Sequence, residues 1–155
     1  MKIQTTRFGE VDVDDSRVIR FPKGLLGFSK YQRYVLIESG DSARPNDDSF
    51  FWWLQSVDLP ELAFVVTDPT LFVSTYKVPI HTEQMQALGL QSIDDAQVFV
   101  IVNKRDKVLT GNLQGPLVIN VGSRSGEQLV LSDRRFTTRV PLMEVRSQVP
   151  QAIPA

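Results

Sequence analysis

Short runs of β-branched and aromatic residues, each ended by a turn signal, are the feature that most constrains this chain. The clearest run covers residues 98–102, which are all apolar, too few for a stable helix, and suited to a strand buried on both faces. Similar runs cover residues 33–37, 50–56, 62–67, 108–110, 117–121 and 128–131, and shorter pieces alternate with turns through residues 1–21. Closure of such a sheet removes the strand edges that promote aggregation. The sequence therefore predicts an all-β, mainly antiparallel, β-barrel-like fold.

One or two short helices are expected within this fold. Thr82 is a suitable N-cap, Glu83 follows it where a negative charge favours the helix dipole, and Gly89 provides a stop. Residues 92–95 have a capping-box-like arrangement that opens a further turn. We expect a helix of about two turns over 82–88, since 3.6 residues make one turn.

The length and apolar content fit a single domain. With 155 residues, of which 42% are hydrophobic and 9% aromatic, the chain can bury a real core. We expect one domain over residues 1–144, followed by a flexible C-terminal tail over 145–155, where Pro150 and Pro154 interrupt a stretch with little apolar content. Residues 38–48, rich in turn formers, are predicted to form a mobile loop.

The balance of charges argues against nucleic acid as a direct partner. There are 17 Lys and Arg against 18 Asp and Glu, so the net charge is −1 and the strong positive field that drives phosphate-backbone binding is missing. No apolar run approaches the roughly 20 residues that cross a bilayer, and residues 1–7 lack the apolar core of a signal peptide. With no cysteine in the chain, we expect a cytoplasmic protein without membrane attachment.

No pattern typical of catalysis stands out. His81 is the single histidine, and no Ser or carboxylate forms a recognisable motif with it. Paired aspartates recur in turns, where their side chains bond nearby backbone amides, without the regular ligand spacing of a calcium loop: Asp14-Asp15, Asp47-Asp48 and Asp94-Asp95. Gly24 and Gly27 lack the downstream Lys-Ser or Lys-Thr of a phosphate loop. The expectation is a protein that is no enzyme and uses no metal or cofactor.

The aromatic run over residues 50–53 is a candidate interface. Strand alternation places successive side chains on opposite faces, so one pair packs and the other faces outward unless a partner covers it. Exposed aromatic side chains are frequent anchors of protein interfaces. Phe51 and Trp52 are therefore candidate partner-binding residues, although core packing is the favoured single explanation of the same run.

Several unusual strings, taken in order, resemble the FliW family of flagellar assembly factors over about residues 3–139. They are Thr6-Arg7-Phe8-Gly9-Glu10, Phe21-Pro22-Lys23-Gly24-Leu25-Leu26-Gly27-Phe28, Trp53-Leu54-Gln55-Ser56, Leu62-Ala63-Phe64, Asp68-Pro69 and Asn112-Leu113-Gln114-Gly115-Pro116-Leu117-Val118-Ile119-Asn120. Two positions depart from the family pattern: Gly115 stands where alanine is usual, and Gly111 where a β-branched residue is common. Neither change removes a functional group.

The resemblance implies a binding protein with two clients. One is flagellin, the filament protein, and the other is CsrA, an RNA-binding repressor of flagellin translation. In such a system flagellin occupies the FliW-like protein while it accumulates, and its export frees that protein to bind CsrA and relieve repression. The circuit depends on mass action between two protein clients.

An acidic patch is expected to serve the CsrA branch. Glu83, Asp94 and Asp95 are the candidate residues, because carboxylates suit a basic RNA-binding partner and oppose RNA electrostatically. Two other classes of function stay open. A small β-barrel that binds single-stranded nucleic acid would use Phe51, Trp52 and Trp53 as stacking platforms, and an enzyme would need a catalytic constellation that the sequence does not display.

Overall fold

The computed structural model describes residues 1–38 and 50–144. The loop predicted over 38–48, apart from Glu38, and the predicted tail over 145–155 lie outside the described residues. The strands are β1 (Lys2–Thr5), β2 (Gly9–Asp12), β3 (Ile19–Arg20), β4 (Arg33–Glu38), β5 (Phe51–Ser56), β6 (Ala63–Thr67), β7 (Ala96–Arg105), β8 (Val108–Gly111), β9 (Leu117–Asn120), β10 (Gly126–Gln128) and β11 (Val140–Glu144). The helical segments are α1 (Thr82–Ala87) and the 3-10 turns η1 (Asp15–Arg17), η2 (Pro69–Leu71) and η3 (Ile93–Asp95).

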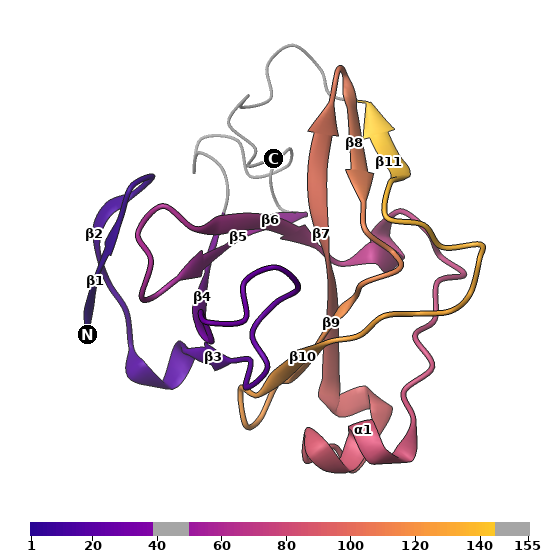
Figure 1. The fold of residues 1–155 in the computed structure, drawn as a ribbon, viewed down its shortest axis with the longest axis horizontal. Helices are drawn as coiled ribbons and strands as arrows, with labels where there is room; N and C mark the ends of the chain where they lie inside the picture. The colour runs from indigo at the N-terminus through magenta and orange to yellow at the C-terminus, as the bar shows by residue number, and fades with distance from the viewer. Residues whose placement is uncertain (39–49, 145–155) are drawn as a thin grey trace.

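The strands form one large curled sheet and a separate hairpin. The large sheet runs in the order β10-β9-β7-β6-β5-β4-β3, with β8 and β11 added beside the second half of β7, and its strand pairs are antiparallel. Curling brings the two ends together (Figure 1), where Arg20 forms a bridge to Ser125. Gly126 fits there because a Cβ would lie 2.6 Å from Cε1 of Phe21. The predicted β-barrel-like, all-β fold is confirmed.

The central strand of this sheet is β7, as residues 98–102 predicted. It spans ten residues and pairs with β9 through its first part, with β6 in the middle and with β8 at its end. Val100 and Val102 are buried, whereas Val98 and Ile101 are half-buried. Beyond β6 the strand continues with β8 and β11 as a projecting arm (Figure 1).

The inner face of the curled sheet holds the largest apolar cluster. Its buried members come from both ends and the middle of the sheet: Ile19, Phe21, Leu25, Tyr34, Leu54, Leu62, Val66, Phe99, Leu117 and Ile119. Because strands distant in sequence contribute to it, the cluster stabilises the closed form of the sheet rather than any single hairpin.

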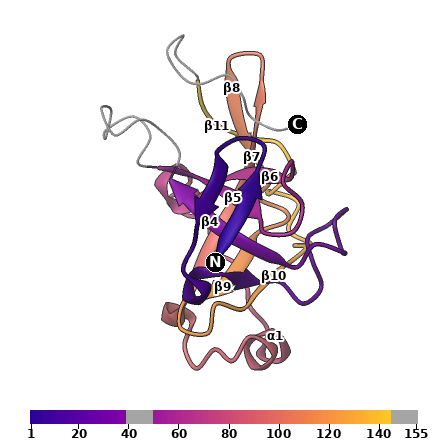
Figure 2. The same ribbon diagram turned by 90° about the vertical axis from the view of Figure 1, so that its left-hand side faces the viewer.

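The outer face of the sheet is covered over Trp53, so this member of the aromatic run packs against other side chains. The β1–β2 hairpin lies across β4 and β5 (Figure 2), and Val35 packs there against Ile3 and Val13. Trp53 is 8% exposed because the Phe8 ring meets it edge-on at 6.0 Å and the Arg7 guanidinium lies 4.1 Å from its ring centroid. Successive side chains of β5 therefore point to two faces that both carry packed apolar side chains, Trp52 and Leu54 on the inner face and Trp53 on the outer.

The helical predictions hold with small shifts. The N-cap of α1 is His81, one residue before the predicted Thr82. The backbone N–H of His81 donates to Oε1 of Gln84 at 2.9 Å. Gly89 (φ 68°) follows the helix in the left-handed region, as predicted for its stop. The expected turn at 92–95 is η3, capped by the hydroxyl oxygen of Ser92, which accepts from the N–H of Asp94 at 3.2 Å.

Two C-terminal strands differ from the prediction. Of the strand predicted over 128–131, only Gln128 lies in a strand, β10, which starts at Gly126. The N–H groups of Leu129 and Leu131 beyond it still donate to the carbonyl groups of Pro116 and Gln114. β11 was not predicted, and it pairs with β8 despite Pro141. Gly111 makes room for it, because a Cβ there would lie only 3.0 Å from Cδ1 of Leu142.

Two buried tyrosines allow a matched test of how much a hydrogen bond to a buried hydroxyl group stabilises the fold. The hydroxyl of Tyr76 donates to the carbonyl of Leu113 at 2.6 Å, whereas the hydroxyl of Tyr34 has no hydrogen-bond partner among residues 1–38 and 50–144. We expect Tyr76→Phe to lower the free energy of unfolding by about 1–2 kcal/mol, because it leaves the Leu113 carbonyl unpaired. Tyr34→Phe should be neutral or stabilising. Urea denaturation of both variants checks this, and equal losses would contradict it.

The buried hydroxyl of Tyr34 leads us to expect a loss of stability at alkaline pH. Burial raises the pKa of Tyr34 from 10.0 to about 12. Its contribution to folding is therefore complete below pH 10.0 and is lost as pH rises towards about 12, since the unfolded chain ionises first. The melting temperature of Tyr34→Phe should fall less steeply than that of the wild type over this window. Parallel curves for the two proteins would contradict this assignment.

Candidate protein-binding surfaces

An acidic surface is assembled where α1, η3 and the end of β9 meet. The side-chain amide of Asn120 donates to the carbonyl of Leu88 at 2.8 Å and so fixes the end of α1 against β9. The N–H of Val121 donates to the carbonyl of Asp95 at 3.1 Å and fixes η3 against the same strand end. The three segments gather at one end of the molecule, around α1 in Figure 1. Sequence segments separated by up to about forty residues thus form one surface, since Glu83 and Val121 both belong to it.

This acidic end, comprising Glu83, Ile93, Asp94, Asp95 and Val121, combines apolar and charged side chains. All three carboxylate residues are exposed, and within the described part of the chain none of them has an ion pair. Ile93 is 57% exposed and Val121 54% exposed. Exposed apolar side chains together with carboxylates suit a partner surface that is apolar and basic. The sequence identified the carboxylates but missed both apolar residues, because isolated aliphatic residues give no local signal of exposure.

The two aromatic candidates are split between the faces of β5. Trp52 is half-buried on the inner face, where it meets the Phe99 ring edge-on at 5.6 Å. Phe51 is half-buried on the outer face, with its ring centroid 5.9 Å from that of Phe72. Because Trp52 and Trp53 are engaged by other side chains, they do not offer the open faces on which bases stack. Two of the three residues on which the nucleic-acid alternative rested are therefore packed against other side chains, and the alternative stays a prediction.

Phe51 still borders an exposed apolar patch. Phe50 is 41% exposed, and its ring lies 6.3 Å from that of Phe72. Leu71 on η2 precedes Phe72 in sequence and is 49% exposed. This patch is a second candidate surface. The sequence did not indicate Leu71 and Phe72 as members, because they lie about twenty residues beyond the start of β5 and Phe72 meets Phe50 and Phe51 only in the folded chain.

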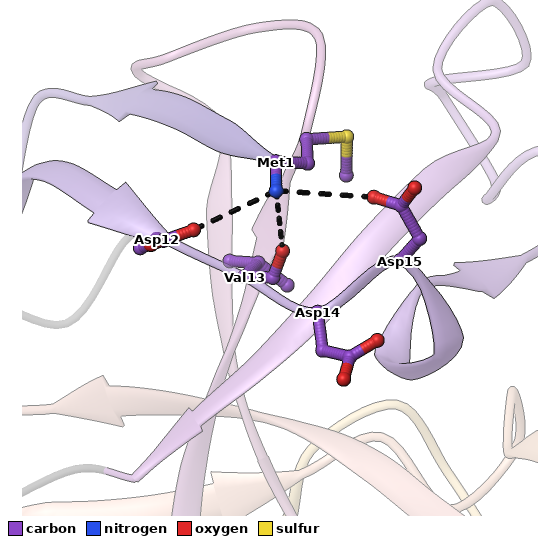
Figure 3. A pocket seen from close by; sticks show the side chains of 5 residues that line it. All are labelled: Met1, Asp12, Val13, Asp14 and Asp15. Atoms are coloured by element: carbon purple, nitrogen blue, oxygen red, sulfur yellow. Dashed lines mark hydrogen bonds and ion pairs between the residues drawn. The ribbon is translucent and has the colours of Figure 1, made fainter.

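The N-terminal acidic cluster has an internal explanation. The ammonium group of Met1 lies 3.5 Å from Oδ1 of Asp12 and 4.0 Å from Oδ1 of Asp15, and it donates to the carbonyl of Val13 at 3.0 Å (Figure 3). The Asp14 carboxylate points elsewhere and accepts hydrogen bonds from the backbone and hydroxyl of Ser16, which lower its pKa. These aspartates serve the chain's own ammonium group and turn, as turn chemistry predicted.

His81 is the N-cap of α1, and its backbone N–H donates to the side chain of Gln84. In residues 1–38 and 50–144 no group of three or more His, Cys, Asp or Glu side chains is arranged to hold a metal ion. Across the same ranges, no helix has the length and apolar character needed to cross a membrane. The surfaces that the structure does present are suited to binding proteins.

Comparison with known proteins agrees with the resemblance seen in the sequence. The family model described as FliW protein matches residues 2–142. The flagellar assembly factor FliW of Natranaerobius thermophilus is 39% identical over 145 residues, covering 92% of each chain, and that of Bdellovibrio bacteriovorus is 39% identical over 92% of this chain and 79% of its own. A crystal structure of the flagellar assembly factor FliW superposes with a TM-score of 0.80 at 30% identity, covering 96% of this chain and 100% of the other. The chain belongs to the FliW family and is a flagellar assembly factor.

Proposed function

We propose that this protein binds flagellin and CsrA in the cytoplasm, and that its binding to CsrA relieves repression of flagellin translation. Residues 1–144 act in this proposal as one binding domain. Flagellin that has not been exported occupies the protein, and export of flagellin releases it to bind CsrA. The observation that carries the proposal is the acidic end, where exposed carboxylates without an ion pair accompany the exposed Ile93 and Val121 and suit a basic RNA-binding client.

The acidic end also supports antagonism of RNA binding. Carboxylates held beside a bound CsrA would repel the phosphate backbone, because like charges in close contact oppose binding of the wrong partner by several kcal/mol. Association with CsrA would moreover be faster at low salt, since opposite charges steer the encounter. Both effects require Asp94 and Asp95 on the exposed turn where η3 holds them.

Reversing the charge of the acidic end tests this assignment. We expect Asp94→Lys combined with Asp95→Lys to weaken CsrA binding about tenfold or more and to flatten its salt dependence. Flagellin binding should stay within about twofold. Calorimetric titration at low and high salt measures both quantities.

A matched control changes two exposed carboxylates outside this surface. Glu38→Lys combined with Glu61→Lys makes the same change in net charge, and it should leave the affinity for CsrA close to that of the wild type. If both double variants bound CsrA as tightly as the wild type, the acidic end would not be the CsrA surface. If both lost affinity equally, net charge rather than a defined surface would account for binding.

A further inference from the structure

The two ends of the curled sheet meet along a seam whose chemistry differs from that of the acidic end. We define the seam as the line along which residues 20–26 run beside residues 124–128. Three contacts join the two segments in order: Arg20 N–H to the Arg124 carbonyl at 2.9 Å, Lys23 Nζ to Glu127 Oε1 at 2.7 Å, and Leu26 N–H to Gln128 Oε1 at 2.8 Å. The meeting of β3 and β10 in Figure 1 marks its position. The seam is therefore a fixed part of the fold.

One end of the seam carries guanidinium groups without acidic partners. Nη2 of Arg124 donates to the carbonyl of Arg17 at 2.9 Å, while its Nε is buried and has no partner within the described residues. Arg124 also has a left-handed backbone (φ 62°). Within residues 1–38 and 50–144, no ion pair joins Arg17, Arg20 or Arg124 to a carboxylate. Arg17 and Arg20 are exposed and Arg124 is half-buried, so the accessible guanidinium groups at this end are suited to receiving carboxylates from another molecule.

The other end of the seam presents apolar side chains on a rigid loop. Leu26 is 61% exposed and Phe28 37% exposed, although the Phe28 ring meets the Phe64 ring edge-on at 5.4 Å. Leu25 is buried at the base of the loop, and the N–H of Phe28 donates to its carbonyl at 2.7 Å. Val130, two residues beyond Gln128, is 67% exposed. A preformed apolar projection binds at a low entropic cost, because little has to be ordered on association.

We infer that the seam docks an acidic, amphipathic segment of a protein client, with Arg20 and Arg124 receiving its carboxylates and Leu26 its apolar face. A protein fits better than nucleic acid, since the most exposed apolar side chains here, Leu26 and Val130, are aliphatic and Phe28 is already packed edge-on against Phe64. The inference rests on the proposed function. CsrA, as a basic client, is repelled by the arginines, so the seam is assigned to flagellin and the acidic end to CsrA. The two clients then use neighbouring surfaces that meet at the turn between β9 and β10, where the N–H of Arg124 donates to the carbonyl of Asn120 at 2.8 Å.

Single substitutions on each surface test this assignment. We expect Arg20→Glu and Leu26→Asp each to weaken binding of monomeric flagellin about tenfold, with CsrA binding within about twofold of the wild type. Val121→Asp, at the acidic end, should have the opposite selectivity. Lys107→Glu, at the exposed tip between β7 and β8, controls for the change in charge and should affect neither client. Each affected side chain is exposed, so thermal unfolding should show that all four variants fold.

The outcomes separate the inference from the proposed function. If the wild type binds flagellin and the two seam variants bind it equally well, the seam assignment is wrong and the proposed function stands. If the wild type binds no flagellin, the proposed function and the seam assignment fail together. Retention of a single-stranded RNA oligonucleotide by the wild type, lost in Arg20→Glu, would instead assign the seam to nucleic acid and overturn the inference.

Discussion

Replacing Gly24 with alanine is expected to lower the free energy of unfolding by about 3 kcal/mol or more. Gly24 has φ 66°, a conformation that costs an L residue energy, and a Cβ built there lies 2.5 Å from Cα of Ser29 and 2.7 Å from the carbonyl oxygen of Phe28. Both neighbours are backbone atoms of the same tight loop, so relief requires the loop to change shape. The loop that carries Leu25 into the core would then be displaced.

Gly27 provides the control for this substitution. Its φ of 85° is equally unfavourable for alanine, but no atom lies within 4 Å of a Cβ built there. Gly27→Ala should therefore lower the free energy of unfolding by only about 1 kcal/mol, the cost of the backbone conformation alone. Urea denaturation of the two variants measures the difference. Similar losses would show that the loop yields easily and that close packing at Gly24 contributes little.

Substituting Gln55 with glutamate is the second change with a large expected effect. Gln55 is fully buried on β5, and its Nε2 atom lies 3.1 Å from each of three carbonyl oxygens, those of Ser56, Pro60 and Leu62. These contacts hold the turn between β5 and β6. A carboxylate there would face three acceptors and would be a buried unpaired charge. We expect a loss of about 3–5 kcal/mol at neutral pH.

The pH dependence distinguishes buried charge from loss of the hydrogen bonds. Burial among acceptors raises the pKa of the introduced carboxyl in the folded state, so its ionisation penalty disappears as pH falls to about 4, near the ordinary glutamate value. The deficit of Gln55→Glu relative to the wild type should shrink over that range. Gln55→Met removes the donor without adding charge, and its deficit should not vary with pH. A deficit of Gln55→Glu that is the same at both pH values would contradict this account.

Local pattern was enough to place most strands. Short β-branched runs such as 98–102 become strands because a brief, fully apolar segment is stable only when buried in a sheet. The left-handed glycine that ends α1 follows from the same kind of local chemistry. The strings shared with the FliW family, among them the one containing Gln55, correctly identified the fold and the family.

Features that depend on distant contacts could not be predicted. Alternation along β5 separates its faces but does not say what covers them, and Trp53 is buried by Arg7 and Phe8 from the first turn of the chain. β11 escaped prediction because Pro141 is unusual in a strand and because its pairing depends on space left by Gly111. The seam combines segments separated by about one hundred residues, so no sequence window contains both of its sides.

The central claim is that one small protein serves two protein clients. Calorimetric titration of the purified protein with CsrA, with monomeric flagellin, and with each client in the presence of the other tests it most directly. The account predicts tight binding of each client and weaker binding of CsrA in the presence of flagellin, because the seam and the acidic end adjoin at the turn between Asn120 and Arg124. Binding of neither client would contradict the proposed function and would leave a shared fold without the proposed activity.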